Sequence, residues 1–212
     1  MIAIVDYGMG NLRSVQKALQ KLGFAAEVTS DADAIRTAEK VILPGVGAFG
    51  AAMHNLRQSG LGCAILHFID SGKPFLGICL GLQLLFERSE ETWSGEHERG
   101  LGVLKGTVVR FPEGLTDVTG RPLKVPHIGW NALHFTRPDE LFDSVEEGSH
   151  VYFVHSYFPQ PDEDEVVTAV SDYGVSFCCA VQWRNVRAVQ FHPEKSSAVG
   201  LRILSNFARG AF

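Results

Sequence analysis

Short apolar segments alternate with helical segments through the first 87 residues, and this alternation restricts the chain to α/β folds. Ile2–Asp6 is an apolar run closed by glycines, as expected for a strand buried in a parallel sheet. Leu12–Leu22 has apolar residues on one helical face and is followed by Gly23, a common helix stop. Strands are expected over residues 2–6, 25–29, 41–43 and 74–78, and helices over 12–22, 30–38, 48–56, 61–71 and 80–87.

The chain changes character after Arg99, where strand-like segments are joined mostly by turns. These segments are residues 103–104, 107–111, 123–125, 152–158, 166–171, 175–182 and 186–191, before a last helix over 197–208. The charged stretch Glu87–Arg99 is expected to be a surface loop. The pattern predicts a flavodoxin-like open, mostly parallel sheet with helices on both faces, and an additional, mostly antiparallel β region in the C-terminal half.

Composition excludes several classes of protein. With 212 residues, 45% of them hydrophobic and 20% charged, the chain is expected to form one domain over residues 1–212. A net charge of −5 provides no basic surface for nucleic acid, and no apolar stretch approaches a membrane span. The first residues lack the features of a secretory signal, and the four cysteines form no C-x-x-C pair. We therefore expect a cytoplasmic protein that binds neither nucleic acid nor a membrane.

The segment Phe75–Gln83 reads as a strand, the pattern G-x-C-x-G and a helix, which is the nucleophile-elbow pattern with cysteine in place of serine. Glycines on both sides of Cys79 permit a tight turn that presents the sulfur at the end of the strand. The following helix start favours a thiolate, and the amide of Leu80 would face an oxyanion beside it. The alternative is a compact core cysteine between two packing glycines.

A base for this thiol is expected at His192, which follows the predicted strand 186–191. Pro193 stiffens the turn, and Glu194 can accept a hydrogen bond from the imidazole and hold its tautomer. Reactive groups of open α/β sheets lie at the carboxyl ends of parallel strands, where both Cys79 and His192 are expected. The sequence therefore predicts a thiol nucleophile, an imidazole base and an orienting carboxylate.

Other patterns do not indicate a cofactor or a metal. Gly45–Gly50 matches G-x-G-x-x-G but follows the third predicted strand, whereas a dinucleotide site uses the first. It better suits a glycine loop that offers a backbone N–H to an oxyanion. His150 and His155 are five residues apart around a strand and would face opposite sides, so no metal site is expected.

Together, Gly77–Gln83 and His192–Glu194 resemble the class I, or triad, glutamine amidotransferases. Further segments resemble the glutaminase subunits of imidazole glycerol phosphate synthase, from the first strand to the last helix. These segments are Asp6–Leu12, Pro44–Gly50, Pro126–Asn131, Tyr152–Tyr157 and Gln190–Ser196. Leu82 departs from this pattern, since methionine is more usual there.

The resemblance implies hydrolysis of L-glutamine through a glutamyl thioester, in a single amidotransferase domain without a cofactor. Its implied site residues are Cys79, His192 and Glu194 as the triad, the backbone of Leu80, Val46 and Gly47 for the oxyanion, and Gln83, Glu91, Ser156 and Tyr157 for the substrate.

The resemblance also implies a heterodimer in which ammonia passes to a separate (β/α)₈ cyclase subunit of histidine biosynthesis. Asn11 and Lys195 are expected to contact that partner. Glutaminase activity is expected to be low in the isolated chain. The alternatives are a glutaminase for anthranilate or pyridoxal phosphate synthesis, a thiol hydrolase or peptidase on the same fold, and a non-catalytic binding module.

Overall fold

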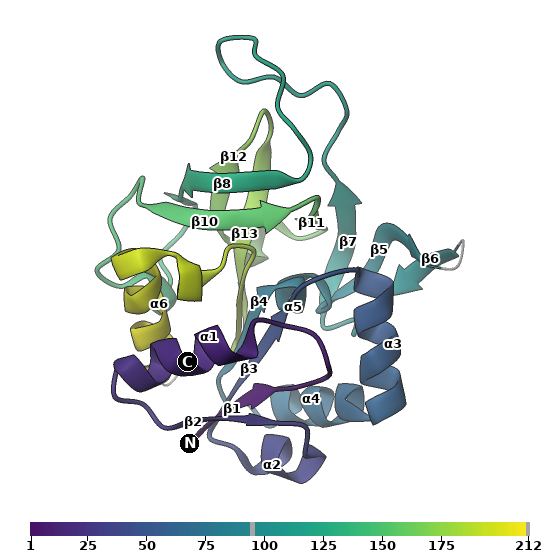
Figure 1. Cartoon of the computed structure of the whole chain (residues 1–212), viewed down its shortest axis with the longest axis vertical. Helices are drawn as coiled ribbons and strands as arrows, with labels where there is room; N and C mark the ends of the chain where they lie inside the picture. The colour runs from purple at the N-terminus through teal and green to yellow at the C-terminus, as the bar shows by residue number, and fades with distance from the viewer. Residues whose placement is uncertain (94–95, 211–212) are drawn as a thin grey trace.

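A computed structural model describes residues 1–93 and 96–210 (Figure 1). Its largest sheet has eight strands in the order β2-β1-β3-β4-β14-β13-β12-β9. The first five strands run parallel to one another, and the pairings from β14 through β13 and β12 to β9 are antiparallel. In that order the strands span Ala26–Thr29, Ile2–Val5, Lys40–Gly45, Phe75–Cys79, Val186–Val189, Ser176–Trp183, Val167–Asp172 and His134–Phe135.

Two smaller sheets belong to the C-terminal β region. One pairs β8 (His127–Ala132) with β10 (His150–His155), and both strands are antiparallel. The other has the order β11-β7-β5-β6, with strands Tyr157–Pro161, Leu104–Arg110, Phe86–Trp93 and Glu96–Arg99. The predicted mixture of a mostly parallel sheet and an antiparallel region is confirmed.

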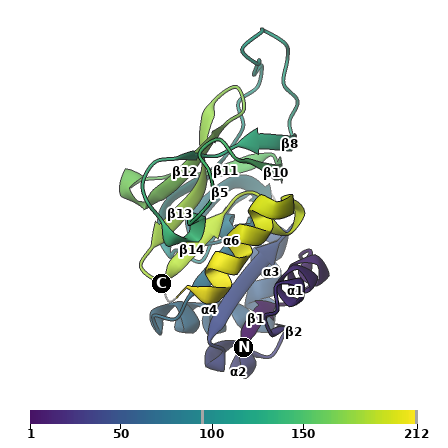
Figure 2. The same cartoon turned by 90° about the vertical axis from the view of Figure 1, so that its left-hand side faces the viewer.

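Helices cover both faces of the large sheet, as predicted (Figures 1 and 2). The α-helices are α1 Leu12–Lys21, α2 Ala32–Thr37, α3 Phe49–Ser59, α4 Leu61–Asp70, α5 Leu80–Gln83 and α6 Ser197–Arg209, and 3₁₀ turns span Glu140–Phe142, Asp164–Val166 and Pro193–Lys195. Alternate residues of β1 divide between two buried clusters, because successive side chains of a strand point to opposite faces. Ala3 and Val5 pack with α3 and α4, and Ile2 and Ile4 pack with α1 and α6.

The predicted helix over 80–87 is too long. Helix α5 ends at Gln83, and β5 begins at Phe86. The segment Leu80–Phe86 is buried throughout, so its apolar run carries no period that separates helix from strand. The predicted surface loop Glu87–Arg99 is also wrong, because β5 and β6 pair there, with residues 94–95 outside the described part.

The segment 127–132 forms a strand that its sequence did not indicate, whereas the predicted strand 123–125 is absent. The predicted strand 152–158 is two strands, β10 and β11, which separate at Ser156 and join different sheets.

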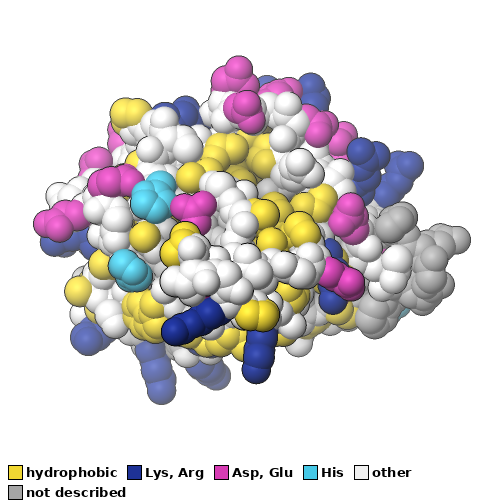
Figure 3. All heavy atoms as spheres, turned by 90° about the horizontal axis from the view of Figure 1, so that it is seen from above, with side chains coloured by type: hydrophobic (Ala, Val, Ile, Leu, Met, Phe, Trp, Pro, Cys, Tyr) yellow, Lys and Arg dark blue, Asp and Glu magenta, His cyan; other side chains and the backbone are white. Residues whose placement is uncertain are grey.

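Exposed large hydrophobic side chains include Ile128 and Trp130 of β8. The upper face of the molecule has hydrophobic side chains near its middle and many charged ones toward its rim (Figure 3).

Within the described residues, no helix is both long enough and apolar enough to cross a membrane.

Candidate active site

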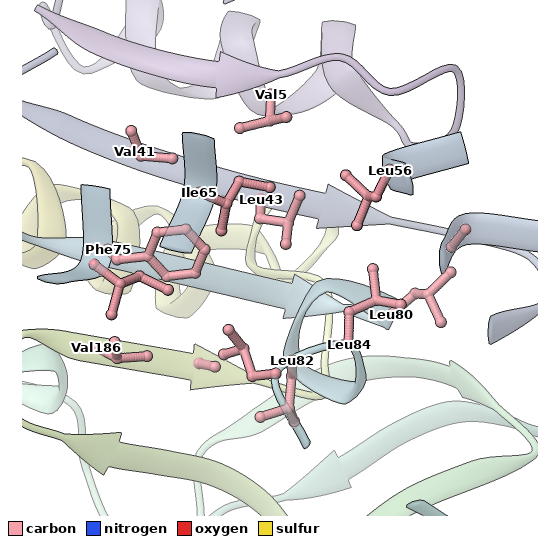
Figure 4. Close-up of a cluster of buried hydrophobic side chains, with 14 of the residues drawn as sticks. Val5, Val41, Leu43, Leu56, Ile65, Phe75, Leu80, Leu82, Leu84 and Val186 are labelled. Atoms are coloured by element: carbon pink, nitrogen blue, oxygen red, sulfur yellow. The ribbon is translucent and has the colours of Figure 1, made fainter. Parts of the chain in front are cut away.

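Cys79 lies at a sharp turn between β4 and α5, with φ 56° and ψ −110°. Residues other than glycine rarely adopt a positive φ, so the backbone at Cys79 is strained, as it is in a nucleophile elbow. Gly81 is required because α5 packs directly on β3, where a Cβ at Gly81 would lie 1.8 Å from the Leu43 carbonyl oxygen. Figure 4 shows Leu43 on one strand and Leu80, Leu82 and Leu84 around the short helix that follows the neighbouring strand. The elbow places the Cys79 sulfur at the carboxyl edge of the sheet.

His192 follows β14, the strand that pairs with β4, so the two neighbouring strands bring the thiol and the imidazole together. The His192 amide donates to the Tyr152 carbonyl (2.9 Å), and its carbonyl accepts from the Ser196 hydroxyl (2.6 Å). His192 Nδ1 lies 2.8 Å from Glu194 Oε1. Because a carboxylate only accepts, Nδ1 carries a proton, which leaves Nε2 as the ring nitrogen that can exchange a proton with the reacting groups. Asn11 Nδ2 donates to the same carboxylate oxygen (3.3 Å).

The His192 imidazole is buried, and Nε2 makes no hydrogen bond of normal length to another side chain or the backbone. Burial lowers the pKa of His192, but the nearby Cys79 thiolate and Glu194 carboxylate outweigh burial and raise it to about 10. The Cys79 sulfur has two further polar neighbours, Gln190 Nε2 at 3.7 Å and the Val154 carbonyl at 4.0 Å. The arrangement favours a thiolate–imidazolium pair oriented by a carboxylate.

A pocket of about 350 Å³ opens beside the sulfur. It brings together most of the residues that the sequence indicated: Val46, Gly47, Cys79, Leu80, Gln83, Glu91, Ser156, Tyr157 and His192. Three further residues line it that the sequence analysis did not assign, namely Pro126, Val154 and His155. Glu194 does not line the pocket and lies behind His192.

Two polar side chains that line the pocket, Gln83 and Glu91, are held in place by hydrogen bonds to neighbouring residues. Gln83 Nε2 donates to the Tyr157 carbonyl (2.8 Å) and to Gln190 Oε1 (3.0 Å). Glu91 Oε2 accepts from the Phe49 amide (2.8 Å) at the start of α3, which ties β5 to that helix. Glu91 therefore reaches the pocket from the strand that the sequence analysis expected to be a loop.

Tyr7 was also missed by the sequence analysis. Its hydroxyl is buried without a hydrogen-bond partner, and a Cβ at Gly45 would lie 2.5 Å from it. Burial and the charge of the Cys79 thiolate raise the pKa of Tyr7 above its usual value, so the phenol stays protonated beside the glycine loop. No local pattern could have indicated it, because Tyr7 meets this loop only through the pairing of β1 with β3.

The two residues expected at the partner surface lie next to the triad. Asn11 contacts Glu194, and the Lys195 ammonium lies 5.8 Å from the centre of the Tyr152 ring. In the described part of the chain, no group of three or more His, Cys, Asp or Glu residues is placed to hold a metal ion.

Comparison with known proteins identifies the family. A family model described as glutamine amidotransferase class-I matches residues 3–211. Imidazole glycerol phosphate synthase subunit HisH of Geobacter metallireducens is 57% identical over 98% of this chain and 97% of its own length, and that of Aquifex aeolicus is 52% identical over 98% and 96%. A solved glutamine amidotransferase covers 98% of this chain and 99% of its own with a TM-score of 0.72 at 20% identity. PurLQS from Thermotoga maritima covers 97% and 96%, also with a TM-score of 0.72 at 20% identity. The chain belongs to the class I glutamine amidotransferase family and, within it, to the HisH subunits of imidazole glycerol phosphate synthase.

Proposed function

We propose that this chain, as one class I glutamine amidotransferase domain over residues 1–212, hydrolyses L-glutamine to glutamate and ammonia for a cyclase subunit of imidazole glycerol phosphate synthase. The observation that carries the proposal is that the buried His192 is hydrogen-bonded to Glu194 and lines, together with Cys79 from the neighbouring strand, a pocket of about 350 Å³. This volume suits an amino acid rather than a folded peptide segment.

In the first half of the reaction, the Cys79 thiolate attacks the carbon of the glutamine side-chain amide. The backbone N–H groups of Leu80 and of the Val46–Gly47 loop stabilise the oxyanion. His192, held by Glu194, donates its Nε2 proton to the departing nitrogen, and ammonia leaves a glutamyl thioester on the sulfur. Glu194 is a positioning residue, because it acts through the imidazole.

In the second half, neutral His192 accepts a proton from water, and the resulting hydroxide attacks the thioester carbonyl. The tetrahedral intermediate expels the thiolate, which again pairs with the imidazolium, and glutamate leaves. Both steps use the same proton site, Nε2, which is the ring nitrogen without a partner in the structure.

The substrate's amino-acid end is assigned to the opposite wall of the pocket. Gln83 and the backbone of Ser156 and Tyr157 would bind the polar groups of the substrate. The Phe49 amide occupies only Oε2 of Glu91, so Oε1 would accept a hydrogen bond from the substrate's ammonium group.

The ammonia is proposed to pass to a (β/α)₈ cyclase subunit in a heterodimer, which forms imidazole glycerol phosphate and aminoimidazole carboxamide ribonucleotide in histidine biosynthesis. Asn11 and Lys195 beside the triad, together with the exposed Ile128 and Trp130 of β8, supply a mixed polar and apolar surface for this partner. The expected compartment is the cytoplasm, where the four free cysteines stay reduced.

A glutamine analogue that carries an electrophile tests the nucleophile. We expect mass spectrometry to find it on Cys79, with protection by glutamine but not by peptides, which separates a glutaminase from a thiol peptidase. Cys63→Ala is the matched control, because Cys63 is the exposed thiol. Modification of Cys63 alone, or protection by peptides, would contradict the assignment.

Steady-state hydrolysis tests the partner. We expect glutaminase activity to be low in the isolated chain and to rise when the cyclase subunit and its ligand are added. Full activity of the chain alone would reject the dependence on a partner, and failure to restore growth of a histidine auxotroph that lacks this subunit would reject the pathway.

A further inference from the structure

A line of four polar contacts leads from the pocket wall into strand β8. The Tyr157 carbonyl lies 2.8 Å from His155 Nδ1, and His155 Nε2 lies 3.1 Å from His127 Nδ1. His127 Nε2 lies 2.8 Å from Asn131 Oδ1, and Asn131 Nδ2 lies 2.6 Å from the Asp172 carbonyl. His127 and His155 are direct partners in the pairing of β8 with β10, so the sheet itself sets the two rings against each other.

The hydrogen atoms available do not suffice for these contacts. Each contact needs one hydrogen, and the carbonyls at the two ends, of Tyr157 and Asp172, only accept. Two neutral imidazoles supply one hydrogen each, and the Asn131 amide can donate to one of its two contacts. Three hydrogens therefore serve four contacts, and one contact fails unless an imidazole takes a second proton.

The surroundings of the two rings oppose a second proton. Burial lowers the pKa of His155 to about 3, against a raising effect of the Tyr157 carbonyl, and repulsion from a protonated His127 or His192 would lower it further. Burial also lowers the pKa of His127, although Asn131 opposes this shift. The other neighbours of the pair are aromatic rings, which belong to Phe111, Phe153, Tyr173 and Phe177. Both imidazoles are therefore neutral near pH 7.

The contact that lacks a hydrogen belongs at the outer end of the line. The contacts of His155 are buried or part-buried, whereas the contact between Asn131 and Asp172 is exposed. A missing hydrogen bond costs most where water cannot replace it. Turning the Asn131 amide over to donate to His127 brings Oδ1 opposite the Asp172 carbonyl, and two acceptors repel each other at the present separation of 2.6 Å. The Asn131 side chain must therefore shift outward, where water can bond to both exposed oxygens.

We propose that His155, His127 and Asn131 are positioning residues for the glutamine pocket. Asn131 Nδ2 donates to His127 Nε2, His127 Nδ1 donates to His155 Nε2, and His155 Nδ1 donates to the Tyr157 carbonyl. The pocket wall at Tyr157 is then held from two sides, because Gln83 Nε2 donates to the same carbonyl. The role in the reaction rests on the proposed glutaminase function, whereas the proton positions do not.

Nitrogen-15 NMR of the histidine rings in the full chain tests the proton positions without any activity. At pH 7 we expect both His127 and His155 to be neutral with the proton on Nδ1. A proton on Nε2 of either ring, or a doubly protonated ring, would overturn the proposal. In Asn131→Asp, whose carboxylate only accepts, His127 Nε2 must gain a proton, and an unprotonated Nε2 there would also overturn it. Asn206→Asp on helix α6 is the matched control, because Asn206 donates to the Leu141 and Asp143 carbonyls and to neither ring, so it should leave both rings unchanged.

A pair of variants at His155 tests the role in the reaction. The amide of His155→Asn lies where Nδ1 lay and can donate to Tyr157, whereas that of His155→Gln reaches the position of Nε2 and leaves Tyr157 without this donor. In the reconstituted complex we expect the KM for glutamine to stay within about twofold in the first variant and to rise about fivefold to tenfold in the second, the effect of one buried hydrogen bond. Equal KM values in the two variants would overturn the positioning role.

The two proposals fail in different ways. A wild-type complex that hydrolyses no glutamine would remove the proposed function while the NMR spectrum still decides the proton positions. If both His155 variants fail to fold, the spectrum of the wild-type chain alone decides between support and rejection.

Discussion

Gly81→Ala is the most direct test of the elbow, because the side chain at this position would meet backbone rather than a movable side chain. The added Cβ would lie 1.8 Å from the Leu43 carbonyl oxygen and 2.9 Å from its carbonyl carbon, whereas ordinary contact begins at 3.4 Å. Either β3 or α5 must therefore move by about 1.6 Å. Leu43 lies in the middle of the parallel sheet, so we expect α5 to move and to carry the Cys79 turn with it.

The expected size of the effect follows from this displacement. Overpacking a well-filled core costs about 1–3 kcal/mol and more when backbone must shift, so we expect a loss of roughly 3 kcal/mol in the free energy of unfolding. For a chain of this length, that loss lowers Tm by roughly 6–12 °C. A misplacement of about 1 Å at a reacting group can reduce the rate on the order of 100-fold, and we expect at least this loss in kcat.

The assay combines thermal unfolding of the chain with glutamine hydrolysis by the complex. Gly62→Ala is the matched control, because the nearest atom to its added Cβ is 3.7 Å away and it lies in helix α4. We expect the control to keep its activity and to change stability by less than about 1 kcal/mol. A Gly81→Ala variant with Tm within 2 °C and kcat within twofold of wild type would refute the argument that close packing of α5 on β3 sets the thiol.

Three further predictions concern single side chains. The pKa of His192 is raised to about 10 in the folded chain, so protonated His192 stabilises the fold fully below about pH 6.5, and this stabilisation is lost as pH rises toward 10. The free energy of unfolding, measured with urea at pH 7 and pH 9.5, should therefore decrease between the two, and it should decrease less in Glu194→Gln. Equal decreases in the two proteins would contradict this cause. Burial lowers the pKa of His155 to about 3, so below pH 6.5 the unfolded chain binds more protons than the folded chain. The free energy of unfolding should therefore decrease as the pH is lowered from 6.5 toward 3, and it should decrease less in His155→Asn; parallel curves for the two proteins would argue against this cause. Trp130 is 46% exposed, so Trp130→Ala should change the free energy of unfolding by less than about 0.5 kcal/mol. The same variant should weaken binding of the cyclase subunit at least about tenfold, as measured by calorimetry, and an unchanged affinity would remove Trp130 from the proposed interface.

Sequence patterns predicted the parallel half of the fold well, because its signals are local. Strands buried on both faces are continuous apolar runs; Gly45 ends β3, and Gly8 lies in the turn between β1 and the next helix. The elbow was also predictable, since Gly77, Cys79 and Gly81 stand two residues apart in the sequence, although the contact that requires Gly81 is with Leu43 on β3. His192 and Glu194 are two residues apart, so their hydrogen bond is local as well.

The antiparallel half was harder to predict, because its strands depend on distant partners. β5 carries charges that suggest a loop, yet it pairs with β7 and β6 and buries Ser89 in between. β8 alternates apolar and polar residues, but its large apolar side chains, Ile128 and Trp130, are exposed and His127 is buried, so the alternation does not mark the buried face. The line from Tyr157 to Asn131 exists only because two such strands meet, and no spacing in the sequence indicates it.

The place of β14 between β4 and β13 has a consequence for the chain as it leaves the ribosome. The strand that carries the thiol emerges early, but its outer edge stays open until residues 186–189 have been made, and the imidazole follows immediately afterwards. A nascent chain therefore exposes an unpaired strand edge for about half of its synthesis and should need protection from aggregation during that time. The same order of synthesis means that an incomplete chain cannot hydrolyse glutamine, because the base, His192, is made only after β14, the strand that pairs with β4.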